Sequence, residues 1–218
     1  MDSAGGPRIV LASRSPRRLE LLSLLVEASQ IEVLPPATAA EADFDSLRDW
    51  ASIERRLSDV AQAKAMDVRQ QLGAQQRADR IEAVLAADTV IVVADTDEAL
   101  RVLGQPPEER WQETVREWFE RYYVGKSHTA ATAVWGISRL GNLAGRVVTS
   151  RVTFHDEIES MIDWYLGTGE PQGKAGGYAL QGAGSVFVEQ VVGSLSNVVG
   201  LPLEAVRELF EELGIDAG

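Results

Sequence analysis

The chain has 218 residues and a net charge of −12, with 45% hydrophobic and 25% charged residues. This composition is that of a soluble globular protein, for which we expect a single domain over 1–218, and its acidic balance argues against nucleic acid and membrane partners. There is no cysteine and there are only two histidines, which excludes disulfides and argues against a zinc site. No apolar run could span a bilayer and residues 1–7 lack a signal-peptide core, so we expect a cytoplasmic location.

The first predicted elements are a strand at Ile9–Leu11 and a helix that begins at Pro16. Proline suits the first position of a helix, and Ser15 before it is a predicted N-cap. Arg17 and Arg18 then fall in the first turn, where their charge opposes the helix dipole unless an anion lies in front of the helix. The alternative is two solvated arginines on a surface helix, and this segment alone favours neither interpretation.

Hydrophobic spacing predicts the remaining elements in chain order. Helices are expected at 47–72, 108–122, 157–166 and 203–213, and strands at 31–34, 83–93, 128–137, 144–154 and 185–192. Residues 37–44 and 97–107 are predicted to be connections. Strands that alternate with helices indicate an α/β fold with a mixed central sheet and flanking helices.

Asp88 is the strongest candidate for chemistry, because it interrupts the long apolar run at 83–93. Such a run is typical of a central strand that is covered on both faces. Burying a carboxylate there is costly unless it binds a cation or a hydrogen-bond donor. A carboxylate in that position can ligate Mg²⁺ or accept a proton from water. The alternative is an aspartate at the end of a strand that caps the next turn, and the apolar flanks favour a functional role.

Two other charged residues are weaker candidates. Glu41 lies in a predicted loop, and its side chain becomes a candidate only if the fold brings it beside Asp88. Lys64 lies among small residues on a predicted helix. Its ammonium could reach a phosphate, although a stem that extends from the core to solvent explains the pattern equally well.

The glycine-rich segment at 167–184 could approach a ligand closely, because glycine imposes no side chain. Lys174 offers a charge for a phosphate and Gln181 can pair with a base edge; the alternative is a flexible surface loop. A second glycine segment, 125–127, resembles the end of a Walker A loop. Glu120 stands where that motif needs glycine and a strand follows, so we predict a plain turn.

Five segments in order resemble the Maf family of nucleoside triphosphate pyrophosphatases, also known as septum-formation inhibitors. They are LASRSPRR at 11–18, ADT at 87–89, GKSH with Thr132 at 125–132, GEP and KAGGY at 169–178, and SNVVGLPL at 196–203. Together they run from the first predicted strand to the last predicted helix, which makes the resemblance far more specific than any single motif.

The resemblance implies two lobes around a cleft, similar to the inosine triphosphate pyrophosphatases. It also implies hydrolysis of a nucleoside triphosphate to a monophosphate and pyrophosphate with a divalent cation (Mg²⁺, Mn²⁺ or Co²⁺). By resemblance, Asp88 is the catalytic proton acceptor and, with Glu41, a metal ligand. The residues implied around the phosphates and metal are Ser13, Arg18, Glu41, Lys64 and Lys174, and those implied in base choice are Arg17, Thr89 and Gln181. The residues at 17 and 181 resemble the branch that acts on dTTP and UTP rather than on 7-methyl-GTP.

The chain departs from the family pattern at two positions. Gln105 and Gly173 stand where the family usually has a lysine and an aspartate. These departures keep open a second hypothesis, a nucleotide-binding regulator of cell division with little turnover. A nucleic-acid-binding protein would suit the arginine cluster but not the net charge. A homodimer is a further option that the sequence leaves open.

Overall fold

The computed structural model describes residues 8–37, 43–95 and 99–215. Seven strands among these residues form one mixed sheet in the order β2-β1-β3-β5-β6-β7, with β4 paired to β3. The strands are β1 (Ile9–Leu11), β2 (Ile31–Val33), β3 (Ala83–Ala94), β4 (Leu100–Leu103), β5 (Ser127–Ser138), β6 (Leu143–Phe154) and β7 (Val188–Val192). β1 pairs in parallel with β2 and β3, whereas the other pairs are antiparallel.

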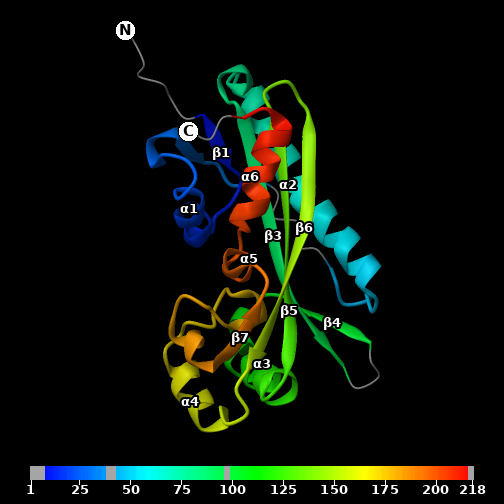
Figure 1. Ribbon diagram of the computed structural model, residues 1–218, viewed down its shortest axis with the longest axis vertical. Coiled ribbons are helices and arrows are strands. Elements are labelled where there is room, and N and C mark those ends of the chain that lie inside the picture. The colour runs from blue at the N-terminus through cyan, green and yellow to red at the C-terminus, as the bar shows by residue number, and fades with distance from the viewer. Residues whose placement is uncertain (1–7, 38–42, 96–98, 216–218) are drawn as a thin grey trace.

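Helices cover both faces of this sheet (Figure 1). They are α1 (Pro16–Leu22), α2 (Trp50–Ala74), α3 (Trp111–Trp118), α4 (Glu159–Gly167), α5 (Leu195–Val199) and α6 (Leu203–Leu213). Side chains of a strand alternate between faces, so β3 contributes to two cores. Leu85 and Ala87 pack with α1 and α6, whereas Ala86 and Val90 lie on the face covered by α2. No helix in the described part of the chain is both long and apolar enough to cross a membrane.

The long strands β3, β5 and β6 extend from an upper lobe with α1, α2 and α6 into a lower lobe with α3, α4 and β7 (Figure 1). The core of the lower lobe is aromatic, and its rings contact one another mostly edge to face or tilted: Phe119, Tyr123, Phe154, Tyr165, Tyr178 and Phe187. The prediction of an α/β protein with a mixed sheet and flanking helices is confirmed.

Several predicted elements differ from the structure in detail. The connection predicted at 97–107 contains β4, a short strand that pairs with the end of β3. Such a strand depends on its partner more than on its own sequence. The strand predicted at 185–192 begins only at Val188, because Ala183–Phe187 form a 3₁₀ helix. The helix predicted at 108–122 comprises α3 and a π-helical turn at Phe119–Tyr123.

Ser15 is the N-cap residue of α1, as predicted, but it does not cap the helix with its side chain. Its backbone is extended, as at an N-cap, but its side chain accepts no capping hydrogen bond from α1. Instead, Ser13 Oγ accepts a hydrogen bond from the N–H of Ser15 at 3.1 Å. The hydroxyl of Ser13 therefore holds the turn between β1 and α1, which places that side chain at the start of the arginine-bearing helix.

Gly176 fixes the KAGGY segment against the lower core. Its φ of +68° suits glycine, and a Cβ there would lie 2.5 Å from Ile91 Cγ1 and 2.6 Å from Tyr123 Oη. We expect Gly176→Ala to lower the free energy of unfolding by about 3 kcal/mol, the sum of left-handed backbone strain and overpacking. Gly173 is the matched control, because it also has positive φ but a Cβ there would meet nothing described within 4 Å. Urea unfolding should therefore show a loss of only about 1 kcal/mol for Gly173→Ala, and equal losses would contradict this explanation.

Candidate active site

The candidate site lies where one edge of β3 has no partner strand among the described residues. β5 pairs with β3 from Ala83 to Val92. On the other edge, β1 pairs only at Ala83–Leu85 and β4 only at Ile91–Ala94. Between these two contacts, at residues 86–90, no described strand pairs with this edge. Ligands in α/β sheets bind beyond the carboxyl ends of parallel strands, and the end of β1 lies beside this gap.

Asp88 lies at this gap and is bound by Lys64. The Nζ of Lys64 on α2 lies 2.5 Å from Oδ1 of Asp88, and the two side chains are 26% and 19% exposed. The ion pair offsets the cost of burying the carboxylate in an apolar strand. Asp88 is in the middle of a strand rather than at its end, so it does not cap a turn. The structure thus brings together two of the predicted site residues, and Lys64 does not simply extend to solvent.

Arg18 joins three of the Maf-like segments on the face of β3 opposite Asp88. Its Nε donates to the carbonyl of Gly200 at 2.9 Å, and its Nη2 donates to Thr89 Oγ1 at 3.0 Å. Its Nη1 donates a longer bond of 3.4 Å to Ser13 Oγ. Burial lowers the pKa of the Arg18 guanidinium, and the negative charge of Asp88 opposes this shift. Arg18 is therefore a cation held by hydrogen bonds within electrostatic reach of Asp88. It is not a solvated surface arginine.

Two polar residues without a predicted role extend this network. Thr132 Oγ1 shares a hydrogen bond of 3.0 Å with Thr89 Oγ1 and donates to the carbonyl of Asn197 at 3.2 Å. The buried amide of Asn197 donates to Ala130 O at 3.0 Å and Ser150 Oγ at 2.9 Å. These bonds tie α5 to β5 and β6 behind Thr89. The only signal in the sequence was that both residues lie in the Maf-like segments.

Arg17 and Lys174 form a second group of cations, beside Glu170. Burial lowers the pKa of Arg17, and the charge of Glu170 opposes this effect. Burial also lowers the pKa of Lys174, and Arg17 lowers it further, so the two cations lie within electrostatic reach of each other. Lys174 Nζ donates to the carbonyl of Gln172 at 3.2 Å. Gln181 is exposed in the same glycine-rich segment.

The donor set at Asp88 suits a metal ion that the substrate helps to bind. Among the residues that the structure describes, no three His, Asp or Glu side chains group closely enough to hold a cation. Glu41, the second predicted ligand, lies outside the described residues. Mg²⁺ in phosphoryl-transfer sites is commonly held by one or two carboxylates together with substrate phosphates. Asp88 fits that mode of binding.

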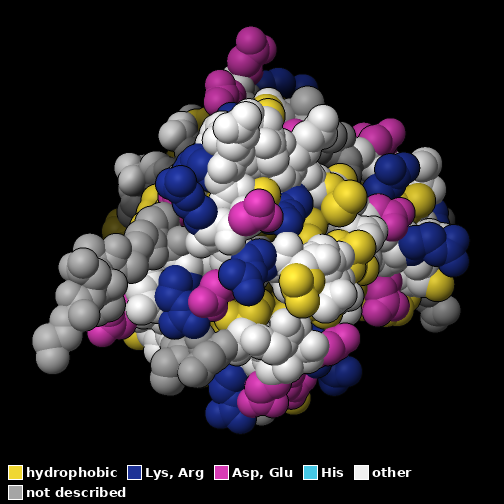
Figure 2. Space-filling view, turned by 90° about the horizontal axis from the view of Figure 1, so that it is seen from above, with side chains coloured by type: hydrophobic (Ala, Val, Ile, Leu, Met, Phe, Trp, Pro, Cys, Tyr) yellow, Lys and Arg dark blue, Asp and Glu magenta, His cyan; other side chains and the backbone are white. Residues whose placement is uncertain are grey.

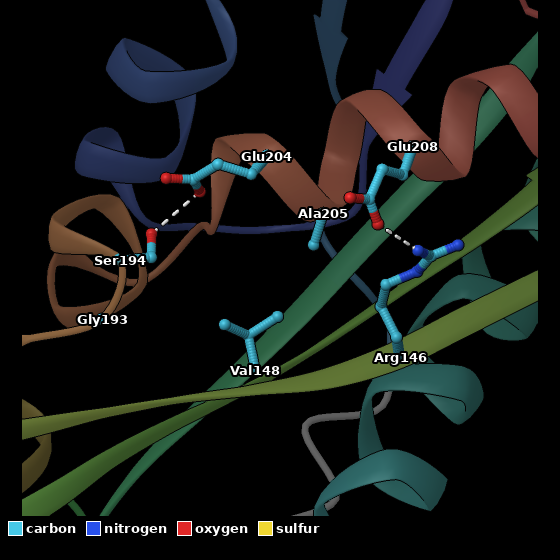
Figure 3. A pocket seen from close by; sticks show the side chains of 7 residues that line it. All are labelled: Arg146, Val148, Gly193, Ser194, Glu204, Ala205 and Glu208. Carbon is cyan, nitrogen blue, oxygen red and sulfur yellow. Dashed lines mark hydrogen bonds and ion pairs between the residues drawn. The ribbon is translucent and has the colours of Figure 1, made fainter.

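The pocket in Figure 3 is a different place in the molecule. It has a volume of about 370 Å³ and is lined by Arg146, Val148, Gly193, Ser194, Glu204, Ala205 and Glu208. Glu204 accepts a hydrogen bond from Ser194 at 2.9 Å, and Arg146 pairs with Glu208 at 2.5 Å. Its arginine is already neutralised and its carboxylates repel anions, so this pocket does not suit a triphosphate.

Comparison with known proteins places the chain in a family. A family model described as Maf-like protein matches residues 8–213. A dTTP/UTP pyrophosphatase of Anaeromyxobacter dehalogenans is 40% identical over 213 residues, which cover 95% of each chain. A dTTP/UTP pyrophosphatase of Pyrococcus abyssi is 34% identical, with 93% of this chain and 95% of that protein covered.

Among solved structures, a nucleoside-triphosphatase (dITP/XTP pyrophosphatase) from Mycobacterium abscessus has a TM-score of 0.39 and 16% identity. It covers 68% of this chain and 74% of that chain, a likeness too partial to carry an argument. The family model and the curated relatives, in contrast, match nearly the whole chain. This chain belongs to the Maf-like protein family.

Proposed function

We propose that this protein is an enzyme that hydrolyses nucleoside triphosphates to nucleoside monophosphates and pyrophosphate, with dTTP and UTP as preferred substrates. The observation that carries the proposal is the Asp88 carboxylate, held by Lys64 at an open edge of β3 with the cation of Arg18 nearby. Two curated relatives that match nearly the whole chain have the name dTTP/UTP pyrophosphatase, which supports both the reaction and the bases.

In the proposed reaction, Asp88 accepts a proton from a water molecule that attacks the α-phosphorus. The bond between that phosphorus and the oxygen bridging to the β-phosphate then breaks. Pyrophosphate leaves with the electron pair, and the water oxygen remains on the monophosphate. Lys64 orients Asp88 before substrate binds, because its ammonium forms an ion pair with Oδ1 of the carboxylate.

Cations on three segments would stabilise the negative charge that builds up on the leaving pyrophosphate. They are Arg18 on α1, Lys64 on α2 and Lys174 in the glycine-rich segment. A guanidinium has about five N–H donors, so the hydrogen bonds that fix Arg18 leave donors for a phosphate oxygen. Ser13 would add its hydroxyl at the same turn.

Base choice is proposed for Arg17, Thr89 and Gln181. Arg17 lowers the pKa of its neighbour Arg18, and it also lies within electrostatic reach of Lys174 and Glu170. The hydroxyl of Thr89 is already bound by Arg18 and Thr132. We therefore infer that Thr89 acts on selectivity through the position of Arg18 rather than by pairing with a base.

A divalent cation, bound by Asp88 and proposed also to be bound by Glu41, would supply positive charge to the phosphates. We expect a chelator to reduce turnover of dTTP to background, and Mg²⁺, Mn²⁺ or Co²⁺ to restore it. Pyrophosphate release and circular dichroism, measured on the same samples, separate loss of metal from loss of fold. Full turnover after exhaustive chelation would contradict a metal requirement.

A panel of canonical and modified triphosphates tests the proposal as a whole. Release of pyrophosphate at low enzyme concentration, fastest with dTTP and UTP, is the expected result. Tight nucleotide binding without any metal-dependent product would instead support the regulator hypothesis, which the names of the relatives do not favour.

The charge distribution supports a small anion as the partner. The net charge is −12, and on the face seen in Figure 2 basic and acidic side chains are interspersed. Such a surface lacks the single-sign field that steers duplex DNA to a protein. We therefore propose that long DNA binds no more tightly than a single triphosphate. A cytoplasmic location, a single domain and a homodimer stay predictions.

A further inference from the structure

The carboxylate of Glu170 connects the two ends of the glycine-rich segment. Its Oε1 accepts hydrogen bonds from the N–H of Gly184 at 2.9 Å and from Tyr165 Oη at 3.0 Å. Its Oε2 accepts one from the N–H of Ala183 at 2.8 Å. Three donors thus converge on one half-buried side chain. Hydrogen bonds to a charged acceptor are about twice as strong as neutral ones, so this contact fixes the backbone that follows Gln181.

The present position of the Glu170 carboxylate leaves no room for a side chain at position 182. A Cβ on Gly182 would lie 1.9 Å from Oε2 of Glu170. Glycine is therefore required next to Gln181 if the carboxylate is to reach the two amides beyond it. The position of Gln181 follows from this contact, because its neighbour in the chain is held against Glu170.

Glu170 also acts on the two cations proposed to bind substrate. Its charge raises the pKa of Arg17 and of Lys174 against the lowering effect of burial. Both cations are partly buried and repel each other. An anion within electrostatic reach of both favours their charged forms. One carboxylate therefore contacts the segment with Gln181 and attracts Arg17 and Lys174.

We propose that Glu170 is a positioning residue for substrate selection, which holds Gln181, Arg17 and Lys174 in the arrangement that reads the base and the phosphates together. The inference rests on the proposed pyrophosphatase function. Both oxygens of Glu170 accept hydrogen bonds from its own chain, so we assign Glu170 a positioning role and no part in the chemical step. Its loss should therefore change substrate binding more than the chemical step.

The test compares kcat and KM for dTTP and dGTP in Glu170→Gln and Gly182→Ala. The first variant removes the charge, and the second keeps the charge but displaces the carboxylate. We expect each to lower the preference for dTTP over dGTP about tenfold, the effect of one charged hydrogen bond. The change should arise in KM, with kcat for dTTP within about threefold of the parent, because the chemistry at Asp88 is untouched. The exposed Glu157→Gln is the matched control and should leave both constants unchanged.

The role of Glu170 and the proposed enzyme activity can fail independently. If the parent hydrolyses dTTP and both folded variants keep its selectivity, the role of Glu170 is wrong and the enzyme activity stands. If only one variant folds, the kcat and KM of that variant decide whether Glu170 acts on selectivity. If neither folds, Glu170 is a structural residue and the inference is overturned. If the parent hydrolyses no triphosphate, the proposed function fails. In that case, equal affinities of the parent and of Glu170→Gln for dTTP would overturn the role of Glu170 as well.

Discussion

Replacement of Asp88 with asparagine should lower kcat/KM for dTTP by about 10³-fold, the range expected for loss of a general base. Asparagine has nearly the same shape but cannot accept the proton of the attacking water. It also removes the negative charge that holds Lys64 at 2.5 Å. Pyrophosphate release under saturating metal and substrate measures the effect, with kcat as the affected constant.

Two controls keep this result interpretable. Asp163→Asn removes an exposed carboxylate on α4 that pairs with Arg116, far in sequence from β3, and should keep the parental rate. Thermal unfolding should show that Asp88→Asn is folded, because the asparagine amide oxygen can still accept a hydrogen bond from Lys64. A folded Asp88→Asn that releases pyrophosphate at the parental rate would remove Asp88 from the mechanism.

The second large effect is a loss of stability at low pH that arises from His128. Burial lowers the pKa of His128 from 6.5 to about 3. Its Nε2 shares a hydrogen bond of 2.8 Å with Tyr178 Oη, and its ring contacts Tyr123 and Phe154. The folded protein therefore holds this histidine neutral, whereas the unfolded chain protonates it near its ordinary pKa.

The stability of the protein depends on pH because protonation of His128 is linked to folding. Between about pH 6.5 and pH 3 the unfolded state binds more protons, so stability falls as the pH falls. Above about pH 6.5 His128 is neutral in both states, and this loss of stability is absent. One pKa unit corresponds to about 1.4 kcal/mol, so the loss should be about 2–3 kcal/mol by pH ~4.5 and about 4 kcal/mol near pH 3.

Denaturant unfolding at several pH values tests this origin of acid sensitivity. His128→Gln should be less stable at neutral pH, because it loses ring packing, but its stability should fall less steeply with acid. His155→Gln is the control, since it removes the other, exposed histidine without changing the aromatic core. If the His128→Gln protein has the same pH slope as the parent, the acid sensitivity comes from other groups.

Much of the fold could be predicted from the sequence because long elements carry their own pattern. The apolar run of β3, the periodic spacing of α2 and the turn before β6 identify those elements without tertiary context. β4 and α5 could not be found in this way. Each has only four or five residues, and each exists because a partner binds it: β3 for β4, and the hydrogen bonds of Asn197 for α5.

The site was predictable where a single residue conflicts with its surroundings. Asp88 is conspicuous in an apolar strand, and Arg18 opposes the helix dipole. The contacts of these residues could not be predicted, because Arg18 binds Gly200, 182 residues away in the chain. The pair of Thr89 with Thr132 depends on the register of β3 and β5. Glu170 binds backbone amides, which have no sequence signature.

The most direct test of the central claim is the fate of the oxygen atom from water during hydrolysis of UTP. In isotopically labelled water, attack at the α-phosphorus would place the label in the monophosphate and leave the pyrophosphate unlabelled. We predict UMP with one labelled oxygen and unlabelled pyrophosphate as the only products. Formation of UDP and inorganic phosphate, or of labelled pyrophosphate, would contradict the proposed reaction.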